Sequence, residues 1–224
     1  YGTLAINTVT DCHTAVGYFA LYGMTGGYSN TAVGYNALSL KTDGTTNTNY
    51  SNCSGLGNDS RVSGSNQVQL GNSSTTVYAY GAVQNRSDVR DKADIRDTQL
   101  GLGFINALRP VDFKWDLRDD YVEQVTEEVD EVGPDETVTK VTRIRAVPIT
   151  RDGSRKRGRY HHGLIAQEVK AVMDQHGLDF GGFQDHQVKG GEDVLSVGYT
   201  ELIAPMIKAI QELSARLDAL EAKA

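Results

Sequence analysis

The chain has 224 residues, with 22 Lys or Arg against 29 Asp or Glu, and its formal net charge is −7. This acidic balance argues against general nucleic-acid binding, which requires a basic surface. No stretch approaches the about 18 apolar residues that a membrane span needs, and no charged and then apolar leader opens the sequence. We therefore expect no signal peptide, no membrane insertion and no nucleic-acid partner.

Charge is distributed unevenly along the chain. Residues 1–81 contain only five charged residues, whereas all four prolines lie after residue 109. Two physically different segments therefore meet near residue 82. The low-charge segment holds both cysteines, Cys12 and Cys53. Two cysteines alone make neither a disulfide framework nor a metal site, so we expect buried or half-buried thiols and no metal or other cofactor.

The low-charge segment contains internal repeats. Thr14–Leu21 recurs as Thr31–Leu38 with seven of eight positions matching, and Leu56-Gly57-Asn58 recurs as Leu70-Gly71-Asn72. Such repeats predict stacked β-turn units in which apolar residues point inward, Gly takes positive φ and Asn ladders or caps the turns. The alternative is a flexible linker, which the composition alone would allow. A repeat this short cannot bury its apolar face alone, so neighbouring repeats or other chains must cover it.

Residues 30–38 and 64–72 resemble the head repeats of trimeric autotransporter adhesins, and phage tail-fibre shafts carry similar repeats. The resemblance implies a homotrimeric, β-roll or β-helix-like fibre.

From residue 97 the pattern becomes globular. Helical spacing over 98–108 ends before Pro110, and 111–115 alternates like a strand. Residues 164–173 predict an amphipathic helix with Gly177 as its C-terminal cap, and 194–199 predict a strand.

A hairpin insertion is predicted at about 121–159, with its turn at 133–136. One arm is acidic, and the other arm with the following loop is basic. Opposite charges across the strands would help to set the register. The basic loop 151–159 could bind phosphate or nucleic acid, but we favour a solvated insertion neutralised by its acidic partner arm.

The last element, about 200–224, carries a heptad pattern. Its apolar residues follow a 3-4-3-4-3 spacing: Ile203, Met206, Ile210, Leu213, Leu217 and Leu220. This narrow stripe is typical of a coiled-coil seam, and the helix should start near Pro205 or kink there. The seam residues do not decide between two and three strands, but the adhesin-like repeats favour three.

Several separated motifs share one further resemblance. Ser87-Asp-x-Arg-x-Lys-x-Asp-Ile95 is followed by Phe104–Trp115, by His161-His162-Gly-Leu-Ile-Ala-Gln-Glu-Val169, and by Tyr199-Thr-Glu-Leu202 before the heptads. This order resembles the C-terminal intramolecular chaperone domain of phage tail fibres, tailspikes and endosialidases. The same autoproteolytic domain occurs in a membrane-bound myelin transcription factor.

The resemblance implies a domain that trimerises, guides folding of the upstream β-fibre and then cuts itself off. Ser87 would be the nucleophile and Lys92 the general base, with cleavage between Arg86 and Ser87. One histidine of the tandem pair also looks functional in the family. We favour His161 over His162, although a structural role remains an equal alternative.

The dyad makes physical demands. Residues five apart lie about 140° apart around a helix and on opposite faces of a strand, so Ser87 must lie at a bend outside the regular element that holds Lys92. A lysine with a pKa of about 10.4 is neutral in about one molecule in 2,500 at pH 7, which costs about 4.6 kcal/mol. Burial on assembly, or a cation such as Arg90, could lower that pKa. Attack on the chain's own Arg86 carbonyl and attack by another subunit's serine both remain open.

The sequence therefore predicts an α+β fold in an intertwined homotrimer. A repetitive β-fibre at 1–86 precedes a mixed α/β chaperone and autoprotease domain at 87–224, which ends in a parallel trimeric coiled coil. We expect a virion tail protein assembled in the bacterial host cytoplasm, with the upstream fibre as the chaperone's partner. The alternatives are a non-cleaving structural trimerisation tip and an adhesin that binds a host cell-surface glycan or receptor.

Overall fold

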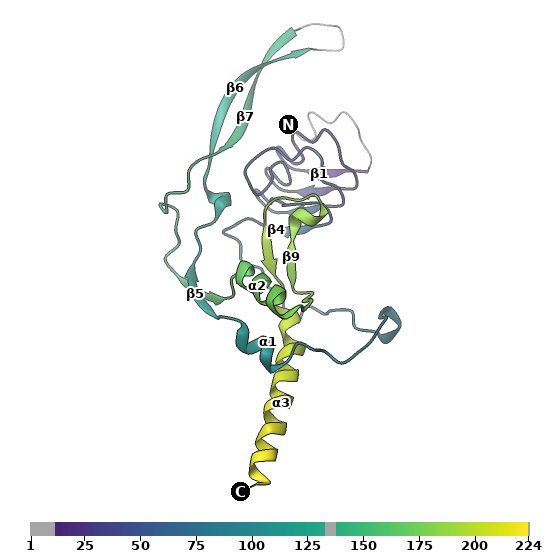
Figure 1. Cartoon of the computed structure of the whole chain (residues 1–224). Coiled ribbons are helices and arrows are strands. Elements are labelled where there is room, and N and C mark those ends of the chain that lie inside the picture. The colour runs from purple at the N-terminus through teal and green to yellow at the C-terminus, as the bar shows by residue number, and fades with distance from the viewer. Residues whose placement is uncertain (1–11, 133–137, 224) are drawn as a thin grey trace. The chain divides into compact units, whose positions relative to one another are not determined.

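Four strands of three residues each form a parallel sheet in the first third of the chain (Figure 1). The computed structural model describes residues 12–132 and 138–223. The strands follow chain order in the sheet: β1 (Thr14–Val16), β2 (Thr31–Val33), β3 (Ser54–Leu56) and β4 (Val68–Leu70). We refer to these strands and their connections as the stack.

The register of the stack explains the sequence repeats. Thr14 pairs with Thr31 and Leu56 with Leu70, so equivalent residues of successive repeats lie next to each other. The two eight-residue copies also share left-handed positions: φ is 59° at Phe19 and 57° at Asn36, and 52° at Leu21 and 55° at Leu38. The predicted stacking of repeats is confirmed, and the flexible-linker alternative is wrong for these residues. The expectation that all apolar residues of the repeats point inward is wrong, because the apolar residue before each glycine is exposed: Val16, Val33, Leu56 and Leu70.

A ladder of glycines follows the strands. Gly17, Gly34 and Gly57 have φ values of 125°, 133° and 106°, which L side chains rarely adopt. A Cβ on Gly17 would lie 2.5 Å from the carbonyl oxygen of Gly34, and a Cβ on Gly34 would meet the carbonyl oxygen of Gly57. Glycine is therefore required both by the backbone conformation and by the close approach of the next repeat.

Gly34→Ala should destabilise the stack by about 2–4 kcal/mol, because strain at positive φ adds to a backbone clash. Gly153→Ala is the matched control, since Gly153 also has positive φ (80°) but nothing lies within 4 Å of the position that its Cβ would take. Denaturant unfolding of both variants would measure the difference. Equal losses in the free energy of unfolding would show that the clash of the new Cβ with the next repeat does not destabilise the stack, and would contradict the prediction.

The interior of the stack is largely apolar, and its buried Asn30 is hydrogen-bonded. Asn30 is fully buried, donates to the carbonyl oxygen of Tyr50 at 2.8 Å and accepts from the backbone N–H of Cys53 at 2.9 Å. Asn52 donates to Asn66 in the next repeat at 2.9 Å, as expected for an Asn ladder. The apolar core consists of Ala20, Leu21, Met24, Ala32, Ala37, Leu38, Tyr50, Cys53 and Val62.

The two thiols differ. Cys53 is buried in this core, and burial raises the pKa of its thiol. Cys12 is exposed, so the expectation of a buried or half-buried thiol is wrong there. Cys12 lies just before β1, where no further repeat covers it within the described residues.

A turn closes the stack after β4. The N–H of Thr75 donates to the carbonyl oxygen of Asn72 at 3.0 Å, and the side chain of Asn72 accepts from the N–H of Ser74 at 3.0 Å. This turn places the Thr75 side chain where a Cβ on Gly71 would stand. Thr75 thus takes the position over Gly71 that the next repeat takes over Gly17 and Gly34.

The predicted hairpin is confirmed for its arms. β6 (Val122–Val132) pairs antiparallel with β7 (Val138–Pro148), while the predicted turn residues 133–136 lie outside the described residues. The ladder places acidic and basic residues opposite each other, as in Glu127 with Arg143 and Asp130 with Lys140.

Two arginines of the basic loop pair with carboxylates other than those of the acidic arm, whereas Lys140 of the basic arm lies 3.7 Å from Glu128 of the acidic arm. Arg151 donates to Asp116 at 2.7 Å, and Arg157 lies 3.2 Å from Asp120. These carboxylates precede the hairpin. They meet the loop because the backbone N–H of Arg157 donates to the carbonyl oxygen of Trp115 at 2.8 Å, which holds the returning loop against residues 115–120.

The remaining elements are small sheets and helices. Their bounds are α1 (Leu102–Ala107), β5 (Val111–Lys114), β8 (Tyr160–Gly163), α2 (Ala166–His176), β9 (Phe183–Asp185), β10 (Leu195–Val197) and α3 (Ile203–Glu221). β5 pairs antiparallel with β8, and β9 with β10. Phe104, Val169, Met173, Phe180 and Leu202 form their buried core. Short turns of 3-10 helix occupy Val89–Asp91, Arg118–Asp120, His186–Lys189 and Tyr199–Leu202.

Helix predictions are confirmed with one correction. α2 ends at Gly177, which is left-handed with φ 61°, and α3 begins at Ile203, so Pro205 lies in its first turn, where no N–H is needed. α1 starts four residues later than expected. The Thr98 hydroxyl accepts from the N–H of Leu100 at 3.1 Å, which forms a local turn in place of the first helical turn.

The chain divides into two compact units. One unit, which we call the stack unit, comprises the chain up to Val77 with Trp115–Gly158 and His186–Asp193. The other, the helical unit, comprises Tyr78–Lys114, Arg159–Asp185 and the chain from Val194. The coarse α+β class is confirmed by these helices and small sheets. None of the described helices is both long and apolar enough to cross a membrane.

Candidate active site

The segment that carries the predicted dyad is built around one short turn. Asp88 caps the 3-10 turn Val89–Asp91 by accepting a hydrogen bond from the N–H of Arg90 at 2.9 Å. The N–H of Lys92 donates to the carbonyl oxygen of Val89 at 3.1 Å and ends the turn, and Lys92 itself is extended. Ser87 and Lys92 therefore flank the turn from outside, which is the arrangement that their spacing requires.

The turn brings the two side chains together. Lys92 Nζ donates to Ser87 Oγ at 2.7 Å, which is hydrogen-bond distance between a nucleophile and its general base. Both residues are exposed in the single chain. In Figure 1 the turn stands out on an open loop to the right of α1. The geometry supplies the contact for a dyad, but this chain alone does not bury it.

Neighbouring charges pair with each other. The Arg90 guanidinium donates to Asp88 at 2.6 Å, and these hydrogen bonds lower the pKa of the Asp88 carboxyl. Arg86 lies 3.1 Å from Asp91, so an ion pair spans the Arg86–Ser87 bond. Because the charge of Arg90 is offset by Asp88, it adds little positive potential near Lys92.

The tandem histidines lie elsewhere in the helical unit. Both are on β8, opposite β5, where His161 faces Phe113 and His162 faces Asp112. His162 Nδ1 lies 2.6 Å from Asp112 Oδ1, whereas the ring of His161 packs 6.0 Å from that of Phe113. In Figure 1 β5 lies to the left of α1 and the Ser87–Lys92 turn to the right of it, so one chain does not bring the three predicted residues together.

The pairing of Asp112 with His162 was not predicted from the sequence. A carboxylate can only accept, so Nδ1 of His162 carries the proton in this contact. Only the β5–β8 register places these two residues opposite each other. The tandem of histidines alone does not show which of them pairs with Asp112.

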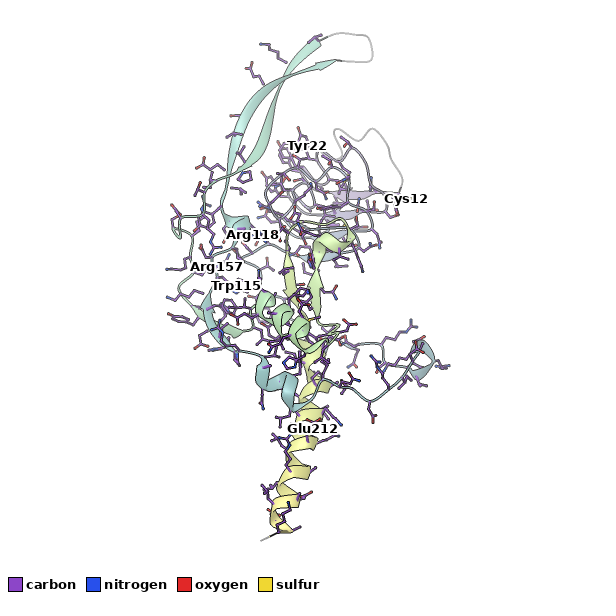
Figure 2. The ribbon with its side chains drawn as sticks, in the orientation of Figure 1. Cys12, Tyr22, Trp115, Arg118, Arg157 and Glu212 are labelled. Atoms are coloured by element: carbon purple, nitrogen blue, oxygen red, sulfur yellow. The ribbon has the colours of Figure 1, made fainter. Side chains whose placement is uncertain are left out.

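α3 presents two different faces. Pro205 and Ala209 are buried, and Glu212 accepts from the N–H of Leu102 at 2.9 Å, so one face packs on α1 and caps its first turn (Figure 2). The predicted seam residues lie on the other face and are 43–65 % exposed: Ile203, Met206, Ile210, Leu213, Leu217 and Leu220.

Within the described residues, no group of three or more His, Cys, Asp or Glu side chains is placed to hold a metal ion.

Residues 87–178 match the family model described as chaperone of endosialidase. This segment belongs to the chaperone-of-endosialidase family. The family name also classes it with serine peptidases, and the match begins at Ser87. No curated protein matches the chain. The match suggests a chaperone role of the phage tail-fibre kind for this segment and is consistent with a place in the virion tail.

Proposed function

We propose that the chaperone segment assembles three copies of the chain, directs folding of the upstream stack and then cuts the Arg86–Ser87 bond. The observation that carries the proposal is the 2.7 Å hydrogen bond from Lys92 Nζ to Ser87 Oγ at the first residue of the family match. The products would be a fibre segment, 1–86, and a released chaperone and autoprotease domain, 87–224.

The chemistry requires no further group on the chain. Ser87 Oγ attacks the Arg86 carbonyl carbon as Lys92 takes the hydroxyl proton. The Arg86–Ser87 C–N bond then breaks, and the amine of Ser87 receives a proton from Lys92. Water hydrolyses the resulting ester and frees the Arg86 carboxylate. A single turnover suffices, so a slow dyad is adequate.

Assembly would gate this chemistry. A protonated lysine cannot act as a base, and desolvation favours its neutral form. Ser87 and Lys92 are exposed in one chain, so packing against other copies would supply the burial. Cleavage would thus follow trimerisation, and the fibre would remain folded because its unfolding barrier is high.

Charges on α3 favour a parallel arrangement of copies. With Ile210 and Leu217 at the first core position of the heptad, Arg216 is at position g and Glu221 at the following position e. In a parallel in-register coiled coil these positions meet between neighbouring helices, so opposite charges pair. In an antiparallel pair, like charges would meet instead.

Denaturing electrophoresis of the purified protein tests the proposal. Wild type should give fragments of residues 1–86 and 87–224, and N-terminal sequencing of the larger should start at Ser87. An assembled wild type that stays whole would refute self-cleavage and favour the structural trimerisation tip.

The histidine role can be assigned separately. We propose that His162, held by Asp112 and 82 % exposed, rather than His161, assists the dyad in the assembled protein. His162→Ala should slow cleavage by about 10²-fold or more, as expected for a group that moves or stabilises a proton. His161→Ala should leave the rate nearly unchanged and weaken the packing with Phe113. Cleavage time courses decide, and the reverse pattern would return the role to His161.

A further inference from the structure

Residues Tyr78–Gly81 repeat the sequence pattern of the stacked strands. In each stacked strand the third residue is apolar and a glycine follows it. The four copies are Thr-Ala-Val-Gly at 14–17 and 31–34, Ser-Gly-Leu-Gly at 54–57, and Val-Gln-Leu-Gly at 68–71. Tyr78-Ala79-Tyr80-Gly81 has the same form. No strand forms there in the single chain.

This fifth copy cannot join the stack of its own chain. Parallel neighbours in a sheet need a crossover of about a dozen residues, but only seven residues separate Leu70 from Tyr78. Four of those seven, 72–75, are used by the turn that closes the stack, and Thr75 already covers Gly71.

The side chains of the fifth copy, residues 78–81, are exposed to solvent in the single chain. Tyr80 is fully exposed and Tyr78 is 90 % exposed, and Val83 beyond them is 87 % exposed. Large apolar residues in closely spaced uncovered positions mark a contact surface rather than a solvated loop.

Gly81 is unexplained within one chain. At Gly17, Gly34 and Gly57 a Cβ would meet the backbone of the next repeat, whereas a Cβ on Gly81 would have nothing within 4 Å. A glycine in a strand pattern marks a place where another backbone approaches closely. At Gly81 the chain itself supplies no such backbone.

We infer that Tyr78–Gly81 is a contact strand between copies of this chain, with the backbone of the same segment of a second copy over Gly81. The inference rests on the proposed homotrimer and names the residues that join the fibre part of its chains. Residues 76–85 carry no charge, so identical segments can meet at a symmetry axis without like-charge repulsion. The parallel seam of α3 would hold the copies in the same direction, as this contact requires.

Glycine substitutions test the backbone approach. In the uncleavable Ser87→Ala chain, Gly81→Ala should raise the concentration needed for half-assembly by about tenfold. Gly158→Ala is the matched control, since neither glycine has positive φ or any neighbour within 4 Å of its Cβ position. Sedimentation over a concentration series measures both. Equal behaviour of the two variants would overturn the inference.

Cross-linking tests the partner without relying on stability. In the Ser87→Ala, Cys12→Ser chain, Tyr80→Cys should form disulfide-linked pairs on a non-reducing gel. Val188→Cys, at a similarly exposed position (79 %), should remain single. Ile210→Cys reports on the α3 seam. Cross-linking at 210 but not at 80 would overturn the contact strand and leave the trimer standing, whereas cross-linking at neither position would overturn both.

Discussion

Ser87→Ala should remain a single chain of 224 residues under conditions in which wild type is cut completely. Removal of the hydroxyl removes the nucleophile, so the rate should fall by about 10⁴-fold or more. The variant should still assemble, because Ser87 is exposed and its side chain bonds to Lys92 on the same loop. Gel electrophoresis with native mass measurement reads both properties. Cleavage of this variant at the same bond would exclude Ser87 as nucleophile.

Lys92→Arg separates the base from the positive charge in the same assay. Arginine keeps the length and charge of lysine but does not lose its proton at accessible pH, so it cannot act as a base. Cleavage should therefore be lost. Arg96→Lys, an exposed substitution in the same loop, should be cut like wild type. Normal cleavage of Lys92→Arg would show that the lysine only holds Ser87 in place.

Ile210→Asp should abolish assembly and, with it, cleavage. Ile210 is 62 % exposed in the single chain, so the substitution costs the isolated fold little. In a closed seam it would bury an unpaired carboxylate in every chain, at a cost of about 3 kcal/mol or more each. The assembled species in native mass measurements and the cleavage products on the gel should therefore disappear together.

The control for the seam is Ala215→Asp, at an outward heptad position of the same helix. It introduces the same charge and the same unfavourable helix propensity outside the seam. Assembly and cleavage should persist. Loss of assembly in both variants would point to weakening of the helix rather than to a seam, and efficient cleavage of monomeric Ile210→Asp would refute assembly gating.

Local patterns predicted the elements well where one short-range rule decides the conformation. Gly177 ends α2 because an open left-handed position suits glycine, and the recurring Thr-Ala-Val-Gly motifs stack because their glycines admit the next backbone. α1 was placed too early because a side-chain hydrogen bond at Thr98 competes with the helix, which helical spacing does not register.

Contacts between segments that are distant in the sequence could not be predicted from sequence patterns. The spacing of Ser87 and Lys92 required a bend, and the Asp88-capped turn between them could be anticipated from its residue types. The pairing of Asp112 with His162 depends on the β5–β8 register, and that of Arg157 with Asp120 on the return path of the loop. Neither pairing leaves a periodic signal, so neither was predicted from the sequence.

Thr75 has a consequence for the size of the assembly. A row of stacked parallel strands with an open last edge can recruit further strands end to end and grow into a filament. Here a threonine side chain occupies the place of the next glycine, so that end offers no template. A further repeat therefore cannot stack on Gly71 at this end. If the proposed cleavage removes the segment that follows, Thr75 stays with the stack and still caps this end.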